Sequence, residues 1–101
     1  MEGDLRSSLA EATLGQSWVR EAPINVVIAA VYERTTGRYG ERGVRYVHME
    51  AGHVGQNLYL QAVARGLGTV AVGAFHDDQV QGLLQLPTDQ KPLYIFPIGY
   101  P

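Results

Sequence analysis

A long stretch with almost no charge constrains the fold of this chain more than any other feature. From Tyr46 to Ala64 the only formally charged side chain is that of Glu50. Apolar side chains recur along this stretch at helical spacing, at Val47, Ala51, Val54, Leu58 and Ala62. The spacing predicts a helix from Val44 to Arg65 with one buried stripe. The opposite side also carries apolar residues, and a helix that is apolar nearly all round is normally buried all round.

The length of this helix indicates more than one chain. At about 1.5 Å per residue it spans roughly 33 Å, close to the full width of a domain whose radius of gyration is about 13 Å. A single chain of 101 residues could hardly enclose such a helix. Ala51, Gly52 and Gly55 are small and would let a second helix approach closely. We therefore expect a homodimer that forms through the helix at Val44–Arg65.

Three apolar segments predict strands. Ile24 to Tyr32 is rich in β-branched residues and nearly continuously apolar, which is typical of a central strand covered on both faces. A short strand is expected from Thr69 to Gly73, and a last one from Lys91 to Tyr100. Pro97 cannot donate a backbone hydrogen bond, so its end of the last strand is expected away from a central position in the sheet.

Helices and one loop are expected between these strands. A first helix is predicted to end at Gly15, and residues 33–43 are predicted to form a polar loop broken by three glycines. A later helix begins near Asp77 and is stopped by Pro87. The elements follow the order αβαβαβ in a single α+β domain that spans residues 1–101.

The composition excludes several classes of function. The net charge of −2 gives no field that would attract nucleic acid or an anionic membrane, and no apolar run approaches the ~20 residues of a membrane span. The sequence has no cysteine, which excludes disulfides and thiolate metal sites. The amino-terminal residues are acidic and polar, unlike a secretory signal. We expect a cytoplasmic protein without nucleic acid or membrane partners.

Two short motifs have ordinary structural explanations. The GLG sequence at residues 66–68 superficially suggests a dinucleotide-binding loop, but such a loop joins a strand to a helix, and here a helix ends and a strand begins. A glycine cap followed by a tight turn explains it. Glu50 and His53 lie one helical turn apart and could belong to a di-metal site if a dimer supplied a second copy. Structural hydrogen bonding is the favoured role, and no metal site is predicted.

An arginine cluster is a candidate for anion binding. Its members are Arg34, Arg38, Arg42 and Arg45. Guanidinium groups match oxyanions bidentately, so the cluster could contact a phosphate or an acidic substrate. Glu33 and Glu41 lie among the arginines, which favours a solvated, internally paired loop as the default. No serine, cysteine or carboxylate is placed to form a nucleophilic triad with a histidine, so the sequence gives no indication of a hydrolase.

The segment from Val70 to Asp78 is the remaining candidate site. An apolar strand that ends in Gly73 and Ala74, with a helix opening near Asp77, leaves backbone N–H groups exposed and lets a flat ring approach. By chemistry alone this is suggestive only, because many turns between a strand and a helix look similar.

The sequence EAGHVGQNLYLQAVARGLGTVAVGAFHDD, followed by PLYIFPIGYP, resembles the carboxy-terminal half of the nitroreductase-like flavoproteins. It is most similar to their thiazole/oxazole-forming peptide dehydrogenase branch. The resemblance extends back through WVREAPINVVIAAVYERTTGRYGERGVRY and so covers nearly the whole chain. It implies a half-length version of that fold, in which helices flank a central, mainly antiparallel sheet.

The resemblance also implies an activity and a cofactor site. It implies an FMN-dependent oxidoreductase that transfers hydride from NAD(P)H to a small organic or peptide acceptor, as an intertwined homodimer with the flavin at the subunit interface. The residues that match the family's isoalloxazine-lining stretch are Ala71, Val72, Gly73 and Ala74. Backbone N–H groups of that stretch contact the N5 edge of the ring, so small side chains are consistent with the role.

Two departures from the family pattern open an alternative. Azoline-oxidising members carry a Lys-Tyr pair with an arginine three residues after the tyrosine, where this chain has Arg38, Tyr39 and Arg42. Tyr39 is a candidate acid/base group or substrate contact, whereas Arg38 stays protonated and cannot act as a base. The family's amino-terminal half, which supplies flavin phosphate contacts, has no counterpart here. A separate chain could supply it, or the protein could be a non-catalytic dimerisation or binding module.

Overall fold

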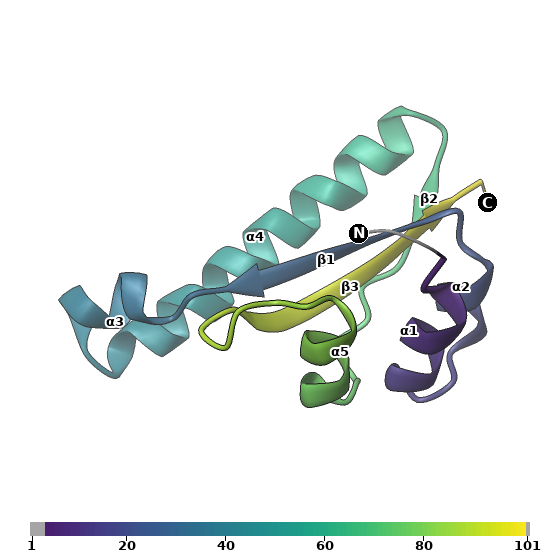
Figure 1. Cartoon of the computed structure of the whole chain (residues 1–101). Coiled ribbons are helices and arrows are strands. Elements are labelled where there is room, and N and C mark those ends of the chain that lie inside the picture. Colours follow the sequence, from purple (N-terminus) through teal and green to yellow (C-terminus); the bar gives the residue numbers. More distant parts are fainter. Residues whose placement is uncertain (1–3, 101) are drawn as a thin grey trace.

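The computed structural model describes residues 4–100, which form five helices and three strands. In chain order the elements are α1 (Arg6–Ala12), α2 (Ser17–Glu21), β1 (Ile24–Ala30), α3 (Glu33–Tyr39), α4 (Arg42–Ala64), β2 (Gly68–Thr69), α5 (Asp77–Leu83) and β3 (Lys91–Gly99). Helix α4 lies along one side of the sheet, and α1, α2 and α5 lie on the other (Figure 1). The predicted α+β fold is confirmed.

The sheet has the order β1-β3-β2, and both pairings are antiparallel. The last strand is therefore central, and β1 is an edge strand whose residues are half-buried or exposed. The prediction that residues 24–32 form a central strand covered on both faces is wrong, as is the prediction that Pro97 lies away from a central position. The reason is that a continuous run of apolar residues occurs both in a central strand and in an edge strand that is apolar on both of its faces, as β1 is.

Pro97 explains why β2 is only two residues long. Thr69 pairs with Ile98 and Val72 with Ile95, so one register continues past residues 70 and 71. Val72 and Ile95 exchange both backbone hydrogen bonds, and alternation makes Val70 and Pro97 the next pair that should do so. Proline has no N–H to donate, and its carbonyl accepts the Thr69 hydroxyl at 2.8 Å instead. The predicted strand from residue 69 to 73 is therefore interrupted.

Successive residues of β3 build the two layers of the core. Ile95 is fully buried in a cluster on the side of α1, α2 and α5, with Leu9, Ala10, Ala12, Val19, Val72 and Val80. Phe96, one residue later, is buried on the opposite side against Gly55 of α4. Side chains of a strand alternate between its faces, so the central strand joins both layers.

Helix α4 confirms the strongest prediction from the sequence, because it begins and ends within two residues of the predicted bounds. Its buried members are Gly43, Val47, Ala51, Gly55 and Ala62. Val54 stays exposed, although it belongs to the predicted stripe, and Leu58 is only half-buried. An outer stripe of Met49, Gly52, Gln56, Leu60 and Val63 faces away from the sheet at helical spacing and is exposed.

Helical structure replaces the one segment that was predicted to be a loop. Residues 33–43 form α3 and the start of α4 rather than a polar loop. Gly40 ends α3 with a φ of 63°, and an added Cβ at Gly43 would lie 3.0 Å from the backbone of Thr36. This close approach lets α3 fold back on α4. Gly66, with a φ of 74°, ends α4 and confirms the glycine-cap explanation of residues 66–68.

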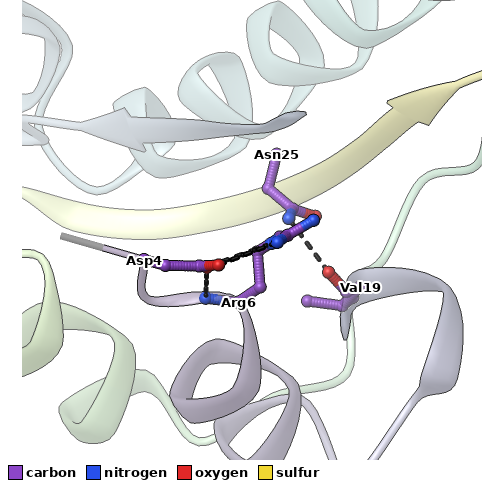
Figure 2. A network of polar contacts seen from close by, with 4 residues as sticks. All are labelled: Asp4, Arg6, Val19 and Asn25. Carbon is purple, nitrogen blue, oxygen red and sulfur yellow. Dashed lines mark hydrogen bonds and ion pairs between the residues drawn. The ribbon is translucent and has the colours of Figure 1, made fainter. Parts of the chain in front are cut away.

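Two separate polar contacts lie near the amino-terminal segment, one between Asp4 and Arg6 and one between Asn25 and Val19 (Figure 2). The Asp4 carboxylate accepts hydrogen bonds from the backbone and guanidinium of Arg6, the shortest at 2.7 Å. These bonds lower the pKa of Asp4 to about 2. The Asn25 amide donates to the Val19 carbonyl at 3.0 Å and so ties β1 to α2. Within residues 4–100, no helix is long and apolar enough to cross a membrane.

Candidate functional site

The predicted ring-binding residues lie in the connection between β2 and α5. Val72 is buried and pairs with Ile95. Gly73 and Ala74 are exposed, and Ala71 is half-buried. We call residues 71–76 the ring turn, because the sequence predicts that this segment meets a flat ring.

The ring turn is held by hydrogen bonds from three directions. Helix α4 contributes the Tyr59 hydroxyl, which accepts the Ala71 N–H at 2.6 Å. Strand β3 exchanges two backbone hydrogen bonds with Val72, at 2.8 and 2.9 Å. The α1–α2 segment contributes the Gln16 amide, which donates to the Ala74 carbonyl at 3.4 Å. The carbonyl of Ala12 accepts the His76 N–H at 2.8 Å. Four contacts therefore fix a segment that has almost no regular secondary structure.

Three backbone donors of the ring turn, the N–H groups of Gly73, Ala74 and Phe75, remain free among the described residues, and those of Gly73 and Ala74 lie on exposed residues. A Cβ added at Gly73 would meet only Tyr94, at 3.7 Å. Exposed, adjacent donors on residues without bulky side chains suit the acceptor edge of a planar heterocycle.

These residues fit the ring of a flavin but not its phosphate. The free N–H groups of Gly73 and Ala74 can meet the hydrogen-bond acceptors at the ring edge. The ring turn and the side chains that hold it contain no arginine or lysine, the residues that bind phosphate most strongly. The candidate ring edge therefore has no phosphate-binding side chain among the residues that form and hold it.

Tyr59 and Gln16 contact the candidate site, and the sequence analysis did not single them out. Tyr59 contacts a residue 12 positions away, and Gln16 contacts one 58 positions away. The only available signal for Tyr59 was a hydroxyl on a helix expected to be buried, since buried hydroxyls normally need a partner.

The second group of predicted site residues lies at the amino-terminal end of α4. The Arg38 guanidinium carbon lies 5.5 Å from the centre of the Tyr39 ring, and that ring packs edge-on against Tyr46 at 5.2 Å. Arg42 lines a shallow hollow with Arg45, Glu41, Val44, His48 and Met49. Helix α3 projects beyond the sheet, away from β2 (Figure 1). Within one chain, the structure does not bring Tyr39 to the ring turn.

The arginine cluster is not internally paired. Among residues 4–100 the single ion pair joins Asp4 and Arg6. Neither Glu33 nor Glu41 forms an ion pair, so the expectation of a paired loop is wrong. The reason is geometric: this segment is helical, and its charged side chains are exposed to water, where an ion pair contributes little. The guanidinium groups remain available to an anion.

A tyrosine–histidine contact borders the same hollow and was not predicted. The Tyr32 hydroxyl lies 2.7 Å from Nε2 of His48, and the two rings meet edge-on. Burial raises the pKa of Tyr32, and the negative charge of Asp77 raises it further. Tyr32 and His48 are 16 residues apart with α3 between them, so no local sequence pattern predicts their contact.

Within the described residues, the side chains of Glu50 and His53 form neither a metal site nor a structural hydrogen bond. Both side chains are exposed and make no hydrogen bond to another described residue. Across residues 4–100 there is no group of three or more histidine, cysteine, aspartate or glutamate side chains that could hold a metal ion. Structural hydrogen bonding of this pair within the chain is therefore not found among the described residues, and hydrogen bonding to a partner helix stays a prediction.

Comparison with known proteins identifies one family. The nitroreductase family matches residues 2–100. A curated protein from Methanocaldococcus jannaschii that bears the name "Putative nitroreductase" is 50% identical over 99 residues, which cover 98% of this chain and 49% of that protein. The chain therefore spans about half the length of this curated relative.

Solved structures agree with the family match. A crystal structure of a protein with the same description from Anabaena variabilis superposes with a TM-score of 0.91 at 37% identity, over 98% of this chain and 20% of that one. The NADPH:FMN oxidoreductase from Vibrio harveyi, solved with NAD+, superposes with a TM-score of 0.80 at 27% identity, over 95% of this chain and 45% of that one.

Proposed function

The chain belongs to the nitroreductase family, and on this premise we propose that it acts as an FMN-dependent oxidoreductase. In this proposal, hydride passes from NAD(P)H through flavin to a small organic or peptide acceptor in the cytoplasm. The observation that carries the proposal is the pair of free N–H groups at Gly73 and Ala74, presented on a turn held from three directions. The similarity to an NADPH:FMN oxidoreductase supports the choice of cofactor and donor.

The residues of the ring turn have distinct roles in this proposal. Gly73 and Ala74 donate hydrogen bonds to the ring edge, and fixed donors of this kind stabilise negative charge that develops there. Val72 anchors the turn to β3, and Ala71 and Val72 complete the lining of the ring. When bound, FMN itself supplies the hydride chemistry.

The arginine end of α4 is proposed to contact the substrate. Tyr39 is half-exposed and can exchange a proton with a substrate, while Arg38 and Arg42 can hold an acidic group. These residues are remote from the ring turn of the same chain (Figure 1). We infer that a second copy brings its own α3 end to the site.

A homodimer through α4 would provide that second copy. The outer stripe exposes Met49, Leu60 and Val63 by 52%, 60% and 72%. Apolar side chains aligned on one helix face favour association with another helix. Ala51 and Gly55, which were expected to face a partner, pack against the chain's own sheet instead. Gly52 remains open to a close helix approach.

The phosphate contacts must then come from elsewhere. The chain covers 49% of its Methanocaldococcus relative, so the rest of that relative has no counterpart here. We propose that a separate chain supplies the amino-terminal half of the fold. The alternative function, a non-catalytic dimerisation or binding module, is favoured by the same observation, since a ring site without phosphate contacts holds FMN weakly.

Comparing FMN with riboflavin tests these proposals. The purified protein is titrated with each ligand, and binding is followed by the change in flavin fluorescence. If the ring turn alone holds the ligand, the two dissociation constants agree within about twofold, because charge-assisted phosphate bonds would otherwise add roughly 1.5–3 kcal/mol each. NADPH oxidation in the presence of FMN then separates an enzyme from a binding module. A protein that binds neither flavin contradicts the proposed function.

A further inference from the structure

One outward-facing donor of the ring turn is already occupied. In an antiparallel ladder, the N–H groups of successive residues point alternately toward the neighbouring strand and away from it. Val72 donates to Ile95 of β3, so Ala71 and Gly73 direct their N–H groups to the open side. Tyr59 accepts that of Ala71 at 2.6 Å. The N–H of Gly73, two residues along the same edge, stays free.

The Tyr59 contact anchors a stretch where Pro97 interrupts the ladder. Val70 makes no hydrogen bond within residues 4–100, because Pro97 has no N–H and its carbonyl accepts the Thr69 hydroxyl, and Ala71 makes only the one to Tyr59. Without Tyr59, the entry to the ring turn would have no anchor between Thr69 and Val72. The freed N–H of Ala71 would then also compete with the N–H of Gly73 for any acceptor at this edge.

The position of Tyr59 is itself fixed by packing. Its ring meets Phe96 edge-on, with centres 5.8 Å apart and an interplanar angle of 83°. Phe96 is only 1% exposed and lies so close to Gly55 that an added Cβ would be 2.9 Å from its ring. Gly55 is one helical turn before Tyr59. The close approach of α4 at Gly55 therefore places the Tyr59 hydroxyl over Ala71.

We propose that Tyr59 is a positioning residue for the ring-binding edge. By accepting the Ala71 N–H it holds the extended backbone at the start of the ring turn, so that the exposed residues Gly73 and Ala74 present free donors to a planar ligand. This inference rests on the proposed function for the identity of the ligand, but the positioning of the backbone can be measured without any ligand.

The test compares Tyr59→Phe with Tyr94→Phe. The first variant keeps the ring against Phe96 and removes only the acceptor. The second removes a hydroxyl from the same aromatic cluster, since Tyr94 packs against Phe96 at 5.4 Å and its hydroxyl makes no hydrogen bond to a described residue. Amide hydrogen exchange of the ligand-free 101-residue chain is measured at Ala71 and Gly73 by NMR.

We expect Tyr59→Phe to accelerate exchange at Ala71 about fivefold, which corresponds to one neutral hydrogen bond. Exchange at Gly73 should also change, because the backbone there is no longer held. Tyr94→Phe should leave both rates unchanged. In protein that binds FMN, Tyr59→Phe should raise the dissociation constant about fivefold and shift the flavin reduction potential, which a merely structural role would not move.

The outcomes separate this inference from the proposed function. If the unsubstituted chain binds no flavin, the proposed function fails, while the exchange rates still decide whether Tyr59 positions the backbone. Equal exchange at Ala71 in the two variants overturns the positioning role. Faster exchange with unchanged flavin affinity and reduction potential also overturns it, because the ring edge would then be independent of Tyr59.

Discussion

The two faces of α4 both carry apolar residues but lie in different environments. The inner face carries Val47, Ala51, Gly55 and Ala62, all buried against the sheet. The outer stripe carries Met49, Leu60 and Val63, all at least half-exposed. The inner face is made of small or β-branched residues and approaches β3 closely at Gly55, whereas Met49, Leu60 and Val63 of the outer stripe are exposed on the side away from the sheet.

This difference shows that one apolar helix can serve two surfaces. The inner face sets the position of Tyr59 and thus of the ring turn. The outer stripe carries exposed apolar side chains aligned on one helix face, which motivates the proposed homodimer. Substitutions on the two faces should therefore have different consequences: those on the inner face change the fold and the site, and those on the outer stripe change association.

The largest effect is expected from charge on the outer stripe. Leu60→Glu combined with Val63→Glu should raise the dimer dissociation constant about 100-fold, because unpaired carboxylates would be buried at the interface. The folded chain should remain intact, since both positions are exposed. Analytical ultracentrifugation measures the constant. Gln79→Glu with Thr88→Glu adds the same charge outside α4 and should leave it unchanged; equal weakening by both pairs would contradict the interface.

A smaller effect is expected from the inner face. Gly55→Ala places a Cβ 2.9 Å from the Phe96 ring and should lower the free energy of unfolding by about 1–3 kcal/mol through overpacking. Urea unfolding at one fixed protein concentration gives the value.

Gly82→Ala is the control for this substitution. Gly82 lies in α5, and nothing lies within 4 Å of an added Cβ, so alanine should be neutral or stabilising by up to about 1 kcal/mol. If both alanine variants were equally stable, α4 would not depend on close approach at Gly55.

Charge removal at the amino-terminal end of α4 should affect substrate selection. Arg42→Gln should lower kcat/KM for nitrobenzoate about fivefold relative to nitrobenzyl alcohol, because an exposed guanidinium contributes only modestly to binding a carboxylate. Arg34→Gln removes an equal charge from the start of α3 and should leave the ratio unchanged. A similar shift with both variants would indicate a general field rather than a contact at Arg42.

The smallest expected effect is at alkaline pH. The pKa of Tyr32 is raised from its ordinary value of 10.0, so the folded chain holds this proton more tightly than the unfolded chain. The associated stability is fully present below about pH 10 and is lost as pH rises through the folded pKa.

Unfolding by urea between pH 8 and 11 tests this effect with two variants. Tyr32→Phe should show a shallower alkaline loss of stability than the unsubstituted protein. Tyr100→Phe, at a position that is 86% exposed, should show the same loss as the unsubstituted protein. Identical profiles for all three proteins would mean that Tyr32 is not linked to folding.

The sequence predicted the position of the long helix better than it predicted which elements pack together. It placed α4 within two residues, because an uncharged apolar repeat is a strong local signal. It failed at residues 33–43, where glycines suggested a loop although Gly40 and Gly43 permit two closely packed helices. It also identified the 71–74 stretch by resemblance. The role of Tyr39 stays a prediction.

By itself, the sequence determined the α+β composition, the long helix and the segment that carries the candidate ring site, because each depends on residues close together along the chain. Only the tertiary structure decided that β3 is central and that Gly73 and Ala74 keep free N–H groups. The first follows from the pairing of β3 with both other strands, and the turn that carries Gly73 and Ala74 is held by Tyr59 and Gln16, which act across separations of 12 and 58 residues. A hydrogen bond joins whichever groups the fold brings within about 3 Å, and local pattern does not specify which groups those are.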